Sequence, residues 1–280
     1  MNKSFWADIL NHECAVPDGY TTPELLPDLM AGLGSTDPEL RDSLCLEILC
    51  TWVYEGRFTP EELRPLVDQL LGNLRVGIGQ GENDQVFLRT FSALVLRWVV
   101  TYDVKAPFLT SAEVHRILET GLQYLADEQD LRGYVPEKGW AHSAAHTADL
   151  MLGLAEHPTL DAADLKRILQ AISAKVLATT PYPFIQREGF RLSKAVVTVL
   201  RREVVPLPDV VAWLEELGGA DQPRSKSFVP GIDDARYHNA EAFLTALHLM
   251  LTYQDVPDAT RAALLPAVHA GLKSFLPWFI

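Results

Sequence analysis

The chain has 280 residues, of which 48% are hydrophobic, and it carries a formal net charge of −13. This hydrophobic content is sufficient for an extensive core and excludes a disordered chain. A strongly acidic surface repels phosphate backbones and no basic run offsets it, so nucleic-acid binding is disfavoured. The most apolar run, "ALVLRWVV", is too short to span a bilayer and contains Arg97, so we expect no membrane segment.

The three cysteines, Cys14, Cys45 and Cys50, are odd in number and have no C-x-x-C spacing. This argues against a disulfide framework and against a cysteine zinc site. Cys45 and Cys50 lie in an apolar helical stretch, so we expect them to be small buried side chains. The first residues, "MNKSFWADILNHE", carry charges through their apolar part and do not resemble a signal peptide. We therefore expect a cytoplasmic protein.

Helix start signals recur along the chain, whereas strand signals are nearly absent. In "TDPELRD", Asp37 can cap a helix and Pro38 occupies its first position; "TPEELRPL" repeats the pattern from Thr59. Similar starts follow at Thr110 and Asp161, and apolar residues then recur at spacings of three and four. We predict about twelve helices, at residues 4–13, 22–32, 38–55, 60–76, 84–103, 111–128, 139–156, 162–178, 187–203, 208–217, 236–254 and 258–277.

A polar residue near the start of the first helix in each successive pair recurs every 48 to 53 residues. The members of this series are Arg41, Arg89, His142, Arg191 and Asn239. Helix pairs repeating at about 40–47 residues are typical of HEAT and armadillo arrays. We therefore predict an all-α chain of stacked antiparallel helical hairpins, a HEAT/armadillo-like α-solenoid, with residues 1–280 as one helical-repeat domain. The five residues would then form a polar row on a concave wall.

The spacing has another explanation, because two helices and two loops need roughly that many residues in any helical protein. An α/α toroid-like array or a compact bundle is therefore the alternative architecture.

The stretch "RGYVPEKGWAHSAAHTADL", residues 132–150, holds the most distinctive polar pattern. His142, His146 and Asp149 lie at i, i+4 and i+7, positions that share one face of a helix. Two histidines at this spacing can supply two imidazoles to one zinc ion, and Asp149 could be a third ligand or orient an imidazole. However, no glutamate follows the first histidine, so the H-E-x-x-H pattern is not met. The structural alternative is that both histidines only hydrogen-bond their surroundings.

The loop before these histidines is a candidate for anion binding. Arg132, Tyr134, Glu137 and Lys138 could face a groove, and free backbone N–H groups at a helix start attract anions. The alternative is a long connection held by its own side chains.

Arg41 and Arg89 are candidate anchors for a carboxylate or phosphate in this acidic chain. The alternative for both is an ion pair within the protein, with Asp42, Glu47 or Asp84.

The runs "DPELRDSLCLEIL", "VFLRTFSALVL" and above all "LRGYVPEKGWAHSAAHTADL" resemble the bacterial family called domain of unknown function 2785. The resemblance extends from Asp37 to at least Leu150, and "YHNAEAFL" further along also fits. The Gly-Tyr-Val-Pro, Gly-Trp-Ala-His and Ala-His pattern is its most specific part. The resemblance implies an uncharacterised helical protein, and it implies no activity, substrate or catalytic residue.

The function that these patterns favour is recognition. A concave polar groove would bind a peptide, a protein segment or a small anionic ligand through Arg41, Arg89, Tyr134, Lys138, Trp140, His142, His146 and Asn239. The alternative is a metal-dependent or acid/base hydrolase centred on His142 and His146, with a divalent metal such as zinc as its cofactor. The chain contains no G-x-S-x-G, Walker or post-strand G-x-G-x-x-G motif. A DNA-binding helical-repeat protein is a third class, which the net charge disfavours.

Overall fold

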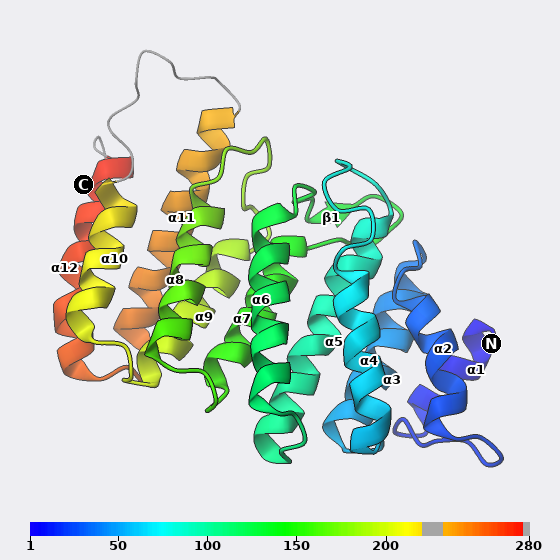
Figure 1. Cartoon of the computed structure of the whole chain (residues 1–280). Coiled ribbons are helices and arrows are strands. Elements are labelled where there is room, and N and C mark those ends of the chain that lie inside the picture. Colours follow the sequence, from blue (N-terminus) through cyan, green and yellow to red (C-terminus); the bar gives the residue numbers. More distant parts are fainter. Residues whose placement is uncertain (220–231, 277–280) are drawn as a thin grey trace. The chain divides into compact units, whose positions relative to one another are not determined.

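The computed structural model describes residues 1–219 and 232–276. Within these residues the chain forms twelve α-helices, one π-helix and one small β-hairpin, which confirms the all-α class (Figure 1). The chain divides into two compact units, Met1–Gly153 and Leu154–Ile280. The solenoid arrangement and the single domain over residues 1–280 remain predictions.

The first unit begins with helices that pack around a long central one. Its elements are α1 (Lys3–Asn11), α2 (Thr22–Gly32), the π-helix η1 (Glu39–Leu46), α3 (Glu47–Tyr54), α4 (Pro60–Asn73), α5 (Gln85–Lys105), α6 (Ser111–Asp127), β1 (Tyr134–Val135), β2 (Gly139–Trp140) and the greater part of α7 (Ser143–Glu156). Helix α5 packs against both α3 and α4, and η1 packs against α1 and α2. Gly121 of α6 lies against Leu150 and Met151 of α7, so α7 is packed closely as its alanine-rich sequence suggests.

The predicted helix starts are confirmed by their caps. The Thr59 hydroxyl accepts a hydrogen bond from the Glu62 N–H, and the Glu62 side chain accepts one from the Thr59 N–H. Thr110 and Glu113 form the same reciprocal pair at the start of α6. Each capping box satisfies two backbone N–H groups that a helix start would otherwise leave without a partner.

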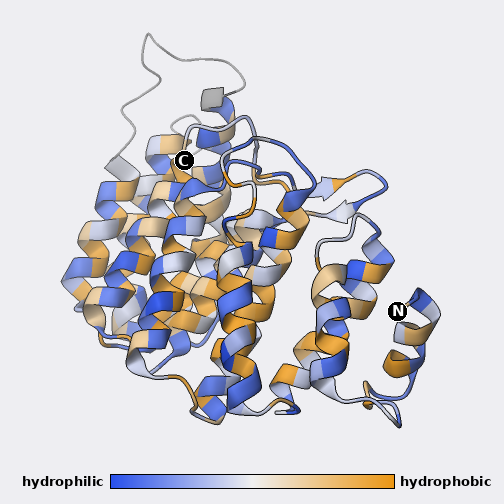
Figure 2. Cartoon of the chain, turned by 45° about the vertical axis from the view of Figure 1, so that its right-hand side comes forward, coloured by the Kyte–Doolittle hydropathy of each residue, from blue (hydrophilic) through white to orange (hydrophobic). Residues whose placement is uncertain are grey.

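The second unit is built from α8 (Ala162–Val176), α9 (Glu188–Arg201), α10 (Leu207–Gly219), α11 (Ile232–Tyr253) and α12 (Asp258–Phe275). Helix α11 packs against both α9 and α12, and α10 packs against α12. Figure 2 shows apolar orange residues alternating with hydrophilic blue ones around these helices, as expected of helices that bury one face. The predicted helix ends agree to within a few residues, except that the predicted residue 277 lies outside the described part of the chain.

Two local features differ from the predicted helices. The helix predicted from residue 38 is a π-helix, η1, before it continues as α3. The helix predicted from residue 139 begins only at Ser143, because Tyr134 pairs with Trp140 and Val135 with Gly139 in a two-stranded antiparallel hairpin. Strands of two residues are too short to show the alternation that identifies strands in a sequence.

Gly139 makes the hairpin compatible with its surroundings. Its φ is +78°, and a Cβ atom there would lie 2.7 Å from the Pro38 Cβ and 3.0 Å from the Arg41 Nη2. Glycine is therefore required both for the backbone conformation and for the close approach to η1.

Cys45 and Cys50 are buried, as predicted, and all three cysteines are free thiols. Burial raises the pKa of the Cys45 thiol to about 12, and burial also raises that of Cys50. Both groups therefore stay protonated at neutral pH and behave as small apolar side chains. None of the helices in residues 1–219 and 232–276 is long and apolar enough to cross a bilayer.

Replacing Gly189 by alanine is expected to lower the free energy of unfolding by about 1–3 kcal/mol, the usual cost of overpacking. A Cβ on Gly189 of α9 would lie 3.0 Å from backbone atoms of Ala242 and Phe243 in α11, so the two helices would have to separate. Gly72→Ala is the matched control: no atom lies within 4 Å of the added Cβ in α4. Alanine should stabilise that helix by about 0.5–1 kcal/mol. Urea denaturation followed by far-UV circular dichroism measures both changes, and equal effects of the two substitutions would contradict the close α9–α11 packing.

Candidate functional site

Three aromatic rings gather at the hairpin, and we call Tyr134, Trp140 and His142 the hairpin face. Tyr134 is 54% exposed, Trp140 is 39% exposed and His142 is half-buried. The Tyr134 and Trp140 rings meet edge to face at 5.1 Å between centroids, and Trp140 stacks on His142 at 4.2 Å. The first contact follows from the register, since cross-strand partners on one face of a hairpin lie close together.

His142 lies outside the helix on which we predicted it. Its φ is +52°, in the left-handed region, and α7 begins at the next residue. The prediction that His142, His146 and Asp149 share one helical face is therefore wrong for His142. Its backbone N–H donates to the Arg132 carbonyl (3.0 Å) and its carbonyl accepts from the His146 N–H (2.9 Å), so hydrogen bonds on both sides fix this strained residue.

His146 is buried, with 7% of its surface exposed. Its Nδ1 lies 3.0 Å from the Thr90 hydroxyl, and its ring packs edge-on against Phe91 of α5 and against His142, at 5.1 and 5.8 Å between centroids. A catalytic imidazole has to reach its substrate, so this burial leaves His146 little access. In the part of the chain that the structure describes, no group of three or more His, Cys, Asp or Glu side chains is placed to hold a metal ion. Metal binding by His142, His146 and Asp149 remains a prediction.

Arg41 of η1 is completely buried and anchors the hairpin to the helices beneath it. Its guanidinium donates to the carbonyl of Ser35 (2.7 Å) and to those of Lys138 (2.8 Å) and Trp140 (3.4 Å). Two of these three acceptors belong to the hairpin, so Arg41 holds the segment that carries the hairpin face.

The charge of Arg41 is compensated inside the protein. Its Nε lies 2.7 Å from the Asp42 carboxylate, the ion pair that the sequence offered as the alternative to ligand binding. The guanidinium also lies over the rings of Phe87 and Phe91, at 4.2 and 4.7 Å from their centroids. Burial lowers the pKa of Arg41, whereas the neighbouring Asp42 raises it. The carboxylate, carbonyl and aromatic partners of Arg41 are therefore all groups of the protein itself.

Arg89 of α5 is also completely buried, and its carboxylate partner is Glu128, not one of the three predicted acids. The pair is bidentate, with Nε and Nη2 at 2.6 and 3.0 Å from the two carboxylate oxygens, and Nη1 donates to the Val76 carbonyl at 2.8 Å. Burial and then the charge of Glu128 raise the pKa of the adjacent Tyr124 well above its ordinary value. Arg89 therefore joins the start of α5 to the end of α6.

Asn239, in the second unit, also forms hydrogen bonds with the backbone of a loop. It is buried, its Oδ1 accepts from the Phe184 N–H (2.6 Å) and its Nδ2 donates to the Tyr182 carbonyl (3.1 Å). Within their own units, Asn239, Arg41 and Arg89 therefore share one role, which is to anchor a loop through its backbone. Arg191 is exposed. A common polar row of these residues along one wall remains a prediction.

The cations around the hairpin face already have carboxylate partners. Lys138 Nζ lies 2.8 Å from both carboxylate oxygens of Asp84, and Arg132 pairs with Asp130 at 2.6 Å. Glu137 is exposed, and Glu82, 3.7 Å from Arg132, is also largely exposed. The surroundings of the hairpin face are therefore acidic on balance.

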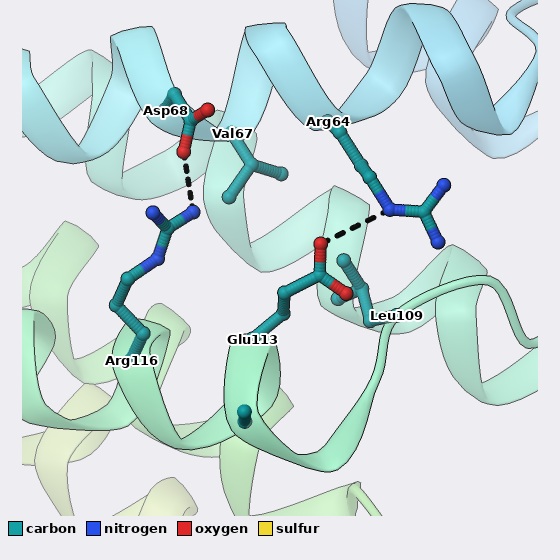
Figure 3. Close-up of a pocket in the computed structure, with 7 residues that line it drawn as sticks. Arg64, Val67, Asp68, Leu109, Glu113 and Arg116 are labelled. Carbon is teal, nitrogen blue, oxygen red and sulfur yellow. Dashed lines mark hydrogen bonds and ion pairs between the residues drawn. The ribbon is translucent and has the colours of Figure 1, made fainter.

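None of three surface hollows in the first unit includes the hairpin face: one of about 250 Å³ is lined mainly by α3 and Trp98, and the other two are larger. One, of about 290 Å³, lies between α4 and α6, where Arg64 pairs with Glu113 at 3.0 Å and Arg116 with Asp68 (Figure 3). Figure 3 shows both ion pairs bridging the two helices, so the charges that line this hollow neutralise one another. The other, of about 610 Å³, is lined mainly by residues of α2 and its neighbours. In the first of these two, the charged side chains are already paired with one another, which leaves a small molecule few polar groups to bind.

The sequence reasoning missed the residues of α5 that support the site. Phe87, Thr90 and Phe91 contact Arg41 or His146. They lie at i, i+3 and i+4 in "VFLRTF", a spacing that could have indicated one shared helix face. What the spacing could not indicate is which element this face would meet.

Comparison with known proteins identifies a family for this chain, and the description of that family gives no activity. No curated protein and no solved structure matches the chain. The family described as "Protein of unknown function (DUF2785)" matches residues 74–249, more than half of the chain, which include the hairpin, His146 and Asn239. The match begins at residue 74, so it does not cover the resemblance seen at residues 37–73, but it reaches residue 249 in the second unit, and the chain belongs to the DUF2785 family.

Proposed function

We propose that this protein is a recognition protein, whose hairpin face binds a peptide or protein segment. The observation that carries the proposal is the exposure of Tyr134 and Trp140 side by side on a rigid hairpin. Most aromatic side chains of a helical protein are needed in the core, and Trp and Tyr are the residues that most often dominate binding energy at interfaces.

The rigidity of the hairpin favours binding over a merely exposed loop. Arg41 holds two of its carbonyls from below, Gly139 contacts η1, and the backbone at His142 is fixed by hydrogen bonds on both sides. A surface that is already ordered loses little conformational entropy when a partner binds.

The charges favour a partner segment that presents a cationic side chain. The exposed carboxylate of Glu137 lies in the hairpin, and an Arg or Lys side chain could also lie against the Trp140 ring. A small anionic ligand, the other partner expected from the sequence, would have to displace Asp84 from Lys138 or Asp130 from Arg132. It is therefore the less favoured ligand.

The wider arrangement is part of the proposal. The recurrence of helix pairs at 48 to 53 residues supports a HEAT-like array in which the hairpin face lies at one end of the α5–α6 pair. The three buried free thiols support a cytoplasmic location. The hydrolase alternative, centred on His142 and His146, is less favoured, because His146 is buried and the Thr90 hydroxyl that it contacts is buried as well.

Peptides selected from a phage-displayed random library on the whole protein are expected to bind Trp140→Ala at least about tenfold more weakly, the loss typical of an aromatic hot spot. Tyr134→Ala should weaken binding as well, and the selected peptides should be enriched in Arg or Lys. Fluorescence anisotropy with the synthesised peptides measures the affinities. Because Trp140 is partly exposed, the melting temperature of the variant should stay close to that of the wild type.

The matched control is Tyr253→Ala, which removes another exposed aromatic ring, 82% exposed, at the end of α11. It should leave the affinity unchanged. His142→Asn tests the third ring, since asparagine tolerates the left-handed backbone conformation better than most residues. Equal binding of the peptides to wild type and Trp140→Ala would contradict the proposal. Selective enrichment of acidic peptides would instead support the anionic ligand.

A further inference from the structure

Two histidines meet on the surface of the second unit, far in sequence from the hairpin. His248 lies on α11 and His269 on α12, and these helices pack against each other. The Nδ1 of His248 and the Nε2 of His269 are 3.2 Å apart, and the ring centroids are 4.9 Å apart. We propose that this pair binds a divalent transition metal ion of the class that imidazole prefers, with Zn²⁺ as the representative ion.

The distance between the two nitrogens fits a shared metal ion. Two Zn–N bonds of 2.0–2.1 Å at a tetrahedral angle place their nitrogens about 3.3–3.4 Å apart. The observed separation differs from this by about 0.1–0.2 Å, within the tolerance for a preformed site. Metal binding therefore requires only a small opening of the pair.

The protonation change is also small. Without metal, one of the two facing nitrogens donates its proton to the other. When His248 carries its proton on Nε2 and His269 carries its proton on Nδ1, both facing nitrogens present lone pairs to the ion. Binding therefore needs only a change of tautomer, and neutral imidazole is the form that binds metals.

The helices on either side hold the two rings in place. A Cβ added to Gly271 of α12 would lie 3.1 Å from the Leu244 side chain, so α12 approaches α11 closely beside His269. Arg261 near the start of α12 donates to the Leu251 carbonyl of α11 at 2.7 Å, which fixes how the two helices are aligned lengthwise. A site carried by two packed helices keeps its geometry better than one on a loop.

The pair is open to solvent, as metal entry requires. His269 is exposed and His248 is half-buried. In residues 1–219 and 232–276 no third His, Cys, Asp or Glu completes a protein ligand set, so water would occupy the remaining positions. Such a site binds more weakly than a closed structural one, and its ion would act as a clip between α11 and α12.

Titration of Zn²⁺ into the full-length, tag-free, metal-stripped protein should show a single saturable site by isothermal titration calorimetry. His248→Ala and His269→Ala should each weaken that binding by about tenfold or more, since even a lost supporting contact to a metal ligand costs 10–100-fold. Zn²⁺ should raise the melting temperature of the wild type and not that of the double variant, because an ion that binds only the folded state stabilises it. Far-UV circular dichroism of the metal-free variants checks that α11 and α12 still form.

Two controls locate the ion. His12→Ala removes an exposed histidine of the first unit and should leave binding unchanged. The double variant His142→Ala/His146→Ala removes the other histidine pair and shows whether the ion lies there instead. The proposal is overturned if the wild type binds no Zn²⁺, if the His248/His269 double variant binds as tightly as the wild type, or if only the His142/His146 variant loses the ion.

Discussion

Arg89→Met is expected to lower the free energy of unfolding by about 3–5 kcal/mol, because it leaves the Glu128 carboxylate buried without its cation. Both members of the pair are almost completely buried, at 1% and 3% side-chain exposure. The substitution also removes a hydrogen bond to the Val76 carbonyl. Chemical denaturation followed by far-UV circular dichroism measures the loss.

Two companion variants test the cause. In Arg89→Met/Glu128→Gln the buried charge is removed while the amide can still accept from the Asp130 N–H, so the double variant should be more stable than Arg89→Met alone. Arg116→Met breaks an ion pair with Asp68 whose side chains are 51% and 60% exposed, and it should cost less than about 1 kcal/mol. If Arg89→Met costs no more than Arg116→Met, the buried pair is not what joins α5 to the end of α6.

Arg41→Ala is expected to cost about 3–5 kcal/mol and to loosen the hairpin. It removes a completely buried side chain and leaves the Asp42 carboxylate without its cation and the carbonyls of Ser35 and Lys138 without their donor. Hydrogen–deuterium exchange should therefore accelerate at residues 134–142.

Arg41→Lys is the more specific test, because lysine keeps the positive charge but lacks the several planar N–H donors of a guanidinium. It should accelerate exchange in the hairpin with a smaller loss of stability. Arg201→Ala serves as control: this arginine is exposed and donates to the Asp255 carbonyl, so its loss should cost less than about 1 kcal/mol and leave the hairpin unchanged. Unaltered exchange in Arg41→Ala would show that the hairpin is ordered without Arg41.

The Arg41→Ala and Arg41→Lys variants also test the proposed function. Arg41 contacts Trp140 through its backbone carbonyl, so any loss of peptide affinity in Arg41→Lys would act through the position of the hairpin. Comparison with Trp140→Ala separates the two effects, because Trp140→Ala should change affinity without changing exchange at the backbone beneath it.

Local sequence determined the helices. Caps such as Thr59 with Glu62 and Thr110 with Glu113, and apolar residues at three and four spacing, are effects within one or two turns of chain, and the predicted helices agree with the structure to within a few residues. The burial of Cys45 and Cys50 followed from the same local patterns. The two-residue strands of the hairpin were missed, because so short a pairing leaves no period to detect.

The sequence indicated the right segment for the candidate site but not the roles of its residues. His142 lies outside α7, Arg89 pairs with an acid 39 residues away, and Arg41 supports the hairpin from beneath. His248 and His269, 21 residues apart, become neighbours only through the way α12 packs along α11. The sequence alone determined which residues form helices, because helix signals are local. Only the tertiary structure decided which polar side chains are buried and which partners they pair with, because those properties depend on contacts between segments that no local pattern encodes.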